Sequence, residues 1–97
     1  MEKIFCVYIT ASKWRGTIYT GMSGDMPKRA MNHKLHLADG FTKKYHVTRL
    51  VYVETHPDAQ SAAARERAIK KWNRDWKIRL IEKDNPEWRD LYDEICQ

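Results

Sequence analysis

The chain has 97 residues, of which 42% are hydrophobic and 32% are charged, with only four glycines and three prolines. This length provides one small domain with a single core, which excludes a two-lobed enzyme that encloses its substrate. The composition also excludes collagen-like and disordered chains, so we expect one folded domain over residues 1–97. A domain of this size offers a shallow surface, which favours macromolecular ligands over deeply enclosed small molecules.

The formal net charge is +5, and the basic residues lie in two blocks. Residues 26–50 and 65–80 each carry +5, whereas residues 81–97 carry −4. If the two basic blocks converge in space, they form the kind of surface that binds a phosphate backbone. A solvated basic face without a partner explains the same charge equally well. The acidic end either docks a basic protein partner or covers its own domain.

The two cysteines, Cys6 and Cys96, lie near opposite ends of the chain and have neither disulfide-ladder nor zinc-site spacing. This cysteine usage is typical of a reducing compartment, and we expect a cytoplasmic protein. The apolar run near the N-terminus is broken by Thr10 and Ser12. It is too short and too polar for a signal peptide or a membrane span, so it predicts a strand and no membrane association.

The first predicted elements are two strands at residues 4–10 and 17–22, both rich in β-branched and aromatic side chains. A hairpin with a loop at residues 11–16 is the simplest connection between them. Counting back from that loop places Tyr8 opposite Tyr19 as a cross-strand pair. Both phenols are therefore expected to project from one face of the sheet.

Alternating helical and extended patterns follow the hairpin. Asp25 is a suitable cap for a helix over residues 26–38, and residues 48–54 have the pattern of a third strand. Residues 59–72 favour a second helix, and residues 73–84 continue helically after a bend. The residues expected to share the buried arc of the second helix are Ala62, Arg65, Ala68, Ile69 and Trp72.

Asn85 and Pro86 predict the start of a final acidic helix, because asparagine caps helices and proline suits the first helical position. On the preceding helical segment, Trp76 and Leu80 are expected to be buried. The resulting order, β-β-α-β-α-α-α, indicates an α+β domain.

Two residues on the first predicted helix have side chains suited to catalysis or phosphate binding. Arg29 and His33 lie four positions apart, so both side chains can lean toward the same face of the sheet. The guanidinium of Arg29 can present two donors to a phosphate. The imidazole of His33 is either part of that constellation or a hydrogen-bonded histidine in an apolar stripe.

Glu66, on the second predicted helix, lies among basic residues. It has two interpretations. One is a salt bridge to Lys70 at the i,i+4 spacing, which stabilises a helix by only about 0.3–0.5 kcal/mol. The other is a carboxylate ligand for Mg²⁺, which needs only one or two protein carboxylates beside water and phosphate oxygens.

These residues carry a resemblance to a known family. The chain resembles the GIY-YIG nucleases in a set of short motifs, which are Cys6-Val7-Tyr8, Tyr19-Thr20-Gly21, Arg29 with His33, and Glu66. Segments 40–45, 49–54 and 85–88 further resemble the small stand-alone bacterial members. Cys6 and Thr20 depart from the motif, because they stand where the family has glycine and isoleucine.

The resemblance implies a three-stranded antiparallel sheet flanked by helices and a DNA endonuclease with one divalent metal ion, Mg²⁺ or Mn²⁺. By similarity, Glu66 is the metal ligand, Arg29 binds the phosphate and Tyr8 activates water. Tyr19 and His33 orient the nucleophile or the phosphate. Free tyrosine has a pKa near 10, so Tyr8 needs the positive charge of the metal and of Arg29 to act as a base.

Asn85 either matches a polar residue near the site of longer family members or acts only as a helix cap. Trp14, in the hairpin loop, either stacks on a nucleobase or packs locally. The candidates for contacts with the nucleic-acid backbone are Lys43, Lys44, Arg49, Lys70, Lys71, Arg74 and Lys77. The alternative function is a nucleic-acid-binding module that uses this basic face without catalysis. A monomer or a weak dimer is compatible with both functions.

Overall fold

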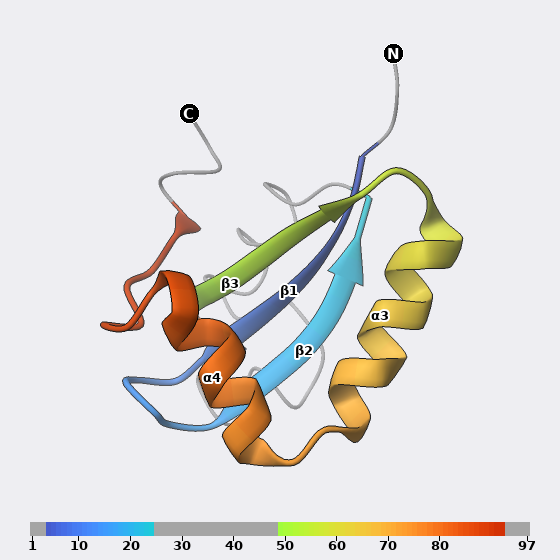
Figure 1. The fold of residues 1–97 in the computed structure, drawn as a ribbon. Coiled ribbons are helices and arrows are strands. Elements are labelled where there is room, and N and C mark those ends of the chain that lie inside the picture. Colours follow the sequence, from blue (N-terminus) through green and yellow to red (C-terminus); the bar gives the residue numbers. More distant parts are fainter. Residues whose placement is uncertain (1–3, 25–48, 93–97) are drawn as a thin grey trace.

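The computed structural model describes residues 4–24 and 49–92 of the chain. Its elements, in chain order, are β1 (Phe5–Ala11), β2 (Ile18–Ser23), β3 (Arg49–His56), α3 (Ala59–Lys71) and α4 (Arg74–Asp84). The three strands form one antiparallel sheet in the order β2-β1-β3, with α3 packed against β1 and β2 and α4 across one end of the sheet (Figure 1). This confirms the expected α+β class and the three-stranded antiparallel sheet.

The central strand, β1, is buried on both of its faces from Cys6 to Ala11. Its β-branched and aromatic side chains suit this position because they pack well on a pleated surface. On one face, Val7 and Ile9 pack with residues of α3 and α4. We call this the helix face. On the other face, Cys6 and Tyr8 pack with Leu50 of β3, and we call this the tyrosine face.

The β1–β2 hairpin is longer than the sequence predicts. Ser12 donates its backbone N–H to the Thr17 carbonyl at 2.9 Å, and Gly16 donates to the Lys13 carbonyl at 2.9 Å. The turn therefore occupies residues 13–16 rather than 11–16. This moves the register by two positions, and the expected pairing of Tyr8 with Tyr19 across the strands was wrong.

A β-bulge interrupts the pairing of β1 with β3. Ile9 lies opposite Tyr52 and Thr10 lies opposite Leu50, so Val51 is an extra residue in β3. Beyond the bulge, Tyr52 and every second residue after it lie on the helix face. Without the bulge, these side chains would project from the tyrosine face.

Polar side chains fix the start of both described helices. Asp58 accepts a hydrogen bond from the backbone N–H of Ser61 at 2.7 Å and caps α3, and Asn73 accepts from the N–H of Trp76 at 3.0 Å and caps α4. α3 buries Ala62 and Ile69 against the sheet. Within the expected arc of α3, Ala68 is exposed instead of buried.

The side chain of Trp76 is 53% exposed, which contradicts its expected burial. It lies in the first turn of α4, whereas the buried residue of this helix is Ile81, near its C-terminal end. Leu80 is partly buried against the same core. The position of the tryptophan on α4 therefore does not indicate which face of the helix is buried.

Residues 86–91 are not helical, so the expected start of a final helix at Pro86 was wrong. Asn85 ends α4, and its carbonyl accepts a hydrogen bond from the N–H of Trp88 at 3.0 Å, which closes a turn. Proline at the second position of a turn has the same backbone φ as proline at the start of a helix. The Trp88 side chain is 0% exposed, and its backbone φ is 56°, outside the helical range. Burial of this side chain therefore favours the turn.

No helix within residues 4–24 and 49–92 is long and apolar enough to cross a membrane. The expected helix at residues 26–38 lies outside the described residues.

Candidate active site

Tyr8 and Tyr19 are neighbours on the tyrosine face, although they are not directly opposite each other. Tyr8 lies opposite Gly21, and Thr10 lies opposite Tyr19, so the two phenols are diagonal neighbours across β1 and β2. Their ring centroids are 6.5 Å apart and the ring planes are inclined at 43°. Because the register moved by an even number of residues, both side chains stay on one face as expected.

Gly21 leaves room for the phenol of Tyr8. A Cβ atom at position 21 would lie 2.6 Å from the Tyr8 hydroxyl oxygen and 2.7 Å from the ring carbon that bears it. It would also lie 3.1 Å from the ring of Tyr19. The glycine after Tyr19-Thr20 is therefore a packing requirement, because any side chain there displaces the tyrosine pair.

Glu66 is linked to the tyrosine pair through Lys70. The ammonium of Lys70 lies 3.0 Å from a carboxylate oxygen of Glu66 and 5.9 Å from the ring centroid of Tyr19. The salt bridge expected from the i,i+4 spacing is present. The same lysine thus brings a positive charge between the carboxylate and the aromatic ring.

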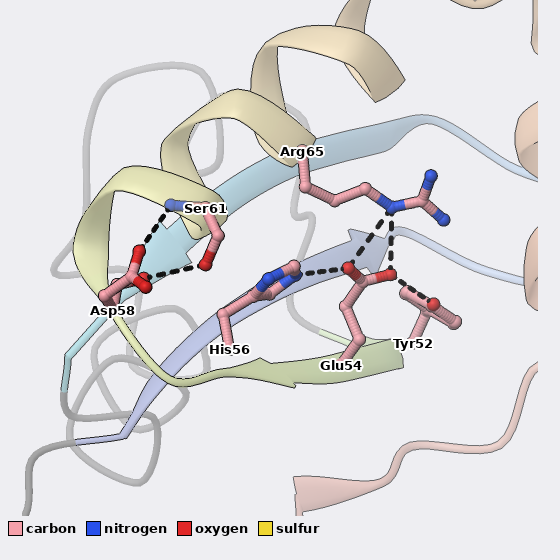
Figure 2. Close-up of polar contacts among 6 residues, drawn as sticks. All are labelled: Tyr52, Glu54, His56, Asp58, Ser61 and Arg65. Carbon is pink, nitrogen blue, oxygen red and sulfur yellow. Dashed lines mark hydrogen bonds and ion pairs between the residues drawn. The ribbon is translucent and has the colours of Figure 1, made fainter.

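A second cluster, on the helix face, fixes the helix that carries Glu66. The Glu54 carboxylate accepts hydrogen bonds from the Tyr52 hydroxyl at 2.5 Å and from Nε of Arg65 at 3.2 Å. It also lies 2.5 Å from Nε2 of His56 (Figure 2). We call these four residues the Glu54 cluster. Because Arg65 is the residue before Glu66, the cluster sets the position of this turn of α3 against β3.

The electrostatics of the Glu54 cluster follow from burial and hydrogen bonding. Burial opposes ionisation of Glu54, but hydrogen bonds from Tyr52 and His56 and the charge of Arg65 outweigh it, so the pKa of Glu54 is lowered. Burial, and then the hydrogen bond to Glu54, raise the pKa of Tyr52 to about 12. Glu54 is therefore a carboxylate, and Tyr52 is a neutral hydrogen-bond donor.

Asn85 is buried, with 3% of its surface exposed, and it joins the end of α4 to β3. Its amide nitrogen donates to the carbonyls of Val51 at 3.1 Å and Arg89 at 2.9 Å, and its oxygen accepts from the N–H of Arg89 at 3.0 Å. It therefore ends a helix and does not begin one. Its described hydrogen bonds hold the chain after α4 and involve neither Glu66 nor the tyrosine pair.

The basic residues predicted to contact nucleic acid differ in their contacts within the protein. Arg49 donates to the Trp88 carbonyl at 3.2 Å, and Arg74 donates to the carbonyls of Arg15 at 2.5 Å and Gly16 at 2.7 Å. Both guanidinium groups thus already bind the backbone. The ammonium groups of Lys71 and Lys77 make no hydrogen bond or ion pair within the described part of the chain. The candidates outside the described residues are Arg29, His33, Lys43 and Lys44.

The donor chemistry at Glu66 fits one divalent metal ion. A carboxylate oxygen is the type of ligand that Mg²⁺ prefers, and a single protein carboxylate suffices when water and phosphate oxygens complete the shell. The Glu66 side chain is 19% exposed, so solvent reaches it. In residues 4–24 and 49–92, no three His, Cys, Asp or Glu side chains gather as a metal cluster.

Comparison with known proteins assigns the chain to a family. The model of the GIY-YIG catalytic domain matches residues 4–79, which contain the three strands, α3 and the first half of α4. The chain belongs to the GIY-YIG family. This family is a nuclease superfamily, and its members generally depend on a divalent metal ion.

Curated GIY-YIG relatives are small staphylococcal proteins. The chain is 34% identical over 82 residues to a UPF0213 protein of Staphylococcus epidermidis. This alignment covers 84% of the present chain and 98% of the relative. It is 35% identical over 81 residues to a UPF0213 protein of Staphylococcus saprophyticus, covering 84% and 96%. A UPF0213 protein of Staphylococcus aureus is 35% identical over 66 residues, covering 68% and 80%. No solved structure matches the chain significantly.

The Glu54 cluster is the part of this GIY-YIG domain that the sequence did not predict. Tyr52, Glu54 and His56 alternate along β3, which is the usual pattern of one strand face. That pattern alone identifies a polar row. It does not indicate which face of the sheet the row occupies, because the bulge at Val51 decides this.

Proposed function

We propose that the protein is an endonuclease that hydrolyses a phosphodiester bond in DNA with one divalent metal ion, Mg²⁺ or Mn²⁺. The observation that carries the proposal is the continuous contact from Tyr8 through Tyr19 and Lys70 to Glu66 in a chain of the GIY-YIG family. It joins two phenols and a carboxylate that lie far apart in sequence.

In the proposed reaction, the oxygen of a water molecule forms a bond to phosphorus, and the bond from phosphorus to the leaving sugar oxygen breaks. Tyr8, as its phenolate, takes one proton of the water, Tyr19 orients the water or the phosphate, and the leaving sugar oxygen takes up a proton from the solvent. Tyr8 is fully buried, so the proposed reaction requires that binding of the substrate open a path for the water to its hydroxyl. Arg29 binds the phosphate and His33 orients it.

Glu66 holds the metal ion in this proposal. The bound ion lowers the pKa of water and stabilises negative charge on the phosphate oxygens. Lys70 has to give up its contact with the Glu66 carboxylate or share it. Its ammonium then lies near the substrate phosphate, together with Lys71, which has no partner among the described residues.

The test is nicking of supercoiled plasmid in Mg²⁺ or Mn²⁺ by the wild type and by Glu66→Gln. We expect the wild type to nick and the variant to lose at least about 100-fold in rate, because the metal and its charge stabilisation are the largest part of such catalysis. Glu87→Gln is the control, since it removes an exposed carboxylate outside the site. Equal nicking by wild type and Glu66→Gln would refute the assignment.

A second function, a nucleic-acid-binding module without catalysis, is favoured by one observation. The salt bridge to Lys70 satisfies Glu66 without a metal ion. In that case the wild type binds DNA with strong salt dependence but shows no metal-stimulated nicking. Salt-insensitive failure to bind DNA would count against both functions.

A further inference from the structure

An open hollow lies at the junction of α3 and α4, away from the tyrosine face. It has a volume of about 350 Å³ and is lined by Trp72, Trp76, Arg79 and Leu80. Figure 1 shows the short connection between the two helices at which it forms. The family-derived active-site residues do not include any of these four side chains.

The two indoles of the hollow have different surroundings. Trp72 is partly buried against the hydrophobic core, and the guanidinium of Arg65 lies 5.1 Å from its ring centroid. Trp76 is 53% exposed and meets Trp72 edge to face, with centroids 5.9 Å apart and an interplanar angle of 77°. One indole is thus anchored, and the other presents an open aromatic surface beside it.

The charge around the hollow is positive. Residues 70–79 carry a formal charge of +4. The guanidinium of Arg79, which lines the hollow, makes no hydrogen bond or ion pair within the described part of the chain, whereas those of Arg65 and Arg74 do. The hollow therefore combines an aromatic platform with a guanidinium that is available to a phosphate.

We propose that this hollow binds an unpaired nucleobase, with the base on Trp76 and the adjoining phosphate at Arg79. Aromatic stacking beside positive charge is the general mode of single-strand recognition. A nucleic acid explains the positive charge, which a second, equally basic copy of this chain would oppose. The inference rests on the proposed function and specifies its substrate as DNA with a single-stranded segment.

The hollow lies close to the candidate active site along the chain. Lys70, whose ammonium reaches both Glu66 and Tyr19, is two residues before Trp72. A strand with one phosphate near Lys70 therefore continues naturally over the end of α3 toward Trp76. This continuity connects recognition of an unpaired base to cleavage nearby.

The test compares two exposed tryptophans. Trp14 is 55% exposed, nearly the same as Trp76, and has Arg15 beside its ring, but its indole N–H donates to the Pro86 carbonyl at 3.4 Å and it lines no part of the hollow. Binding of a fluorescent oligothymidylate and of a matched duplex is measured in EDTA, where metal-dependent hydrolysis is absent. We expect Trp76→Ala to weaken oligothymidylate binding about tenfold, equal to about 1.4 kcal/mol, and duplex binding by less than about twofold. Trp14→Ala should change neither.

Arg79→Gln is a second variant, with Arg67→Gln as the control for loss of one positive charge on an exposed helix position. We expect Arg79→Gln to weaken oligothymidylate binding more than Arg67→Gln does. Equal effects within both pairs of variants would overturn the inference. A Trp76-dependent change in sedimentation without oligonucleotide binding would also overturn it, in favour of a contact between copies of the chain.

The nicking assay tests the proposed function, and the binding assay tests the base site, so either proposal can be refuted without the other. Glu66-dependent nicking with binding that is indifferent to Trp76 keeps the proposed function and removes the base site. Trp76-dependent binding without nicking keeps the base site and leaves a binding module.

Discussion

Tyr8 combines complete burial with close approach to a residue that has no side chain. Its hydroxyl occupies the space in which a side chain at Gly21 would begin. The position of this phenol is therefore determined by the backbone of β2 as well as by its own rotamer. A phenol held in this way cannot turn away from the sheet without disturbing the strand beside it.

Gly21→Ala tests this constraint. The added methyl group would lie within 2.7 Å of two Tyr8 atoms, so we expect a loss of about 1–3 kcal/mol in the free energy of unfolding, as for other overpacked sites. Urea denaturation measures it. In the Tyr8→Leu background the same substitution should cost clearly less, because the smaller side chain leaves room. An equal cost in both backgrounds would show that the glycine serves the strand alone.

Two carboxylates at α3 make contacts of different strength, one between the helix and β3 and the other within the helix itself. On the helix face, Arg65 bonds to Glu54, which also binds Tyr52 and His56. At the β2 edge, Glu66 forms a single salt bridge with Lys70, whose side chain is 48% exposed. Water competes with the second contact much more than with the first.

Glu54→Gln should therefore destabilise the protein by about 1–3 kcal/mol, because it weakens several hydrogen bonds to one partly buried charge. Glu66→Gln is the matched control and should change the free energy of unfolding by less than about 0.5 kcal/mol. Chemical denaturation of both variants gives the comparison. Equal losses would contradict the unequal roles of the two carboxylates. A stable Glu66→Gln protein also means that lost nicking reports on chemistry and not on unfolding.

The sequence predicts the three strands, α3 and α4 to within about two residues, because their apolar patterns are strong. It does not predict the register of the hairpin, since Ser12 and Thr17 extend the pairing beyond the apolar run. It also assigns a helix at Pro86, where the need to bury Trp88 produces a turn. Such features depend on tertiary contacts that a local pattern does not contain.

The candidate site was predictable in part. Tyr8, Tyr19 and Glu66 follow from family motifs, and Lys70 follows from helical spacing. The hollow at Trp76 was not predictable, because a tryptophan at that spacing normally indicates a buried position. Exposure of a large aromatic side chain is a property of the folded surface, and only the structure reveals it.

At the scale of the whole molecule, Glu82 ties three distant segments together. Its carboxylate accepts two hydrogen bonds from Arg15 of the hairpin loop, each at 2.9 Å, and one from the Trp88 indole at 2.7 Å. Arg74 binds the same loop. The hairpin, α4 and the turn after it are therefore expected to respond together when Glu82 is protonated.

Hydrogen bonds from Arg15 and then Trp88 lower the pKa of Glu82 from its usual 4.5 to about 2. The unfolded chain takes up this proton near pH 4.5 and the folded protein near pH 2, so the stabilisation is complete above pH 4.5 and is lost as the pH falls to 2. Glu82→Gln should lower the Tm at neutral pH and flatten its decline over that window. Thermal unfolding across this pH range measures both effects. Asp84→Asn, at an exposed position on α4, should leave the slope unchanged.

The extra residue in β3 determines which face of the sheet carries the Glu54 carboxylate. Val51 shifts the alternation, so that Glu54 lies under α3 while Val53 packs beside Tyr8. If β3 instead kept regular pairing from Leu50, with Val51 opposite Ile9, these two side chains would exchange faces, and a carboxylate would lie against the phenol that is proposed to accept a proton. That negative charge would oppose the phenolate, so the bulge at Val51 keeps Glu54, which anchors α3, apart from the proposed catalytic base.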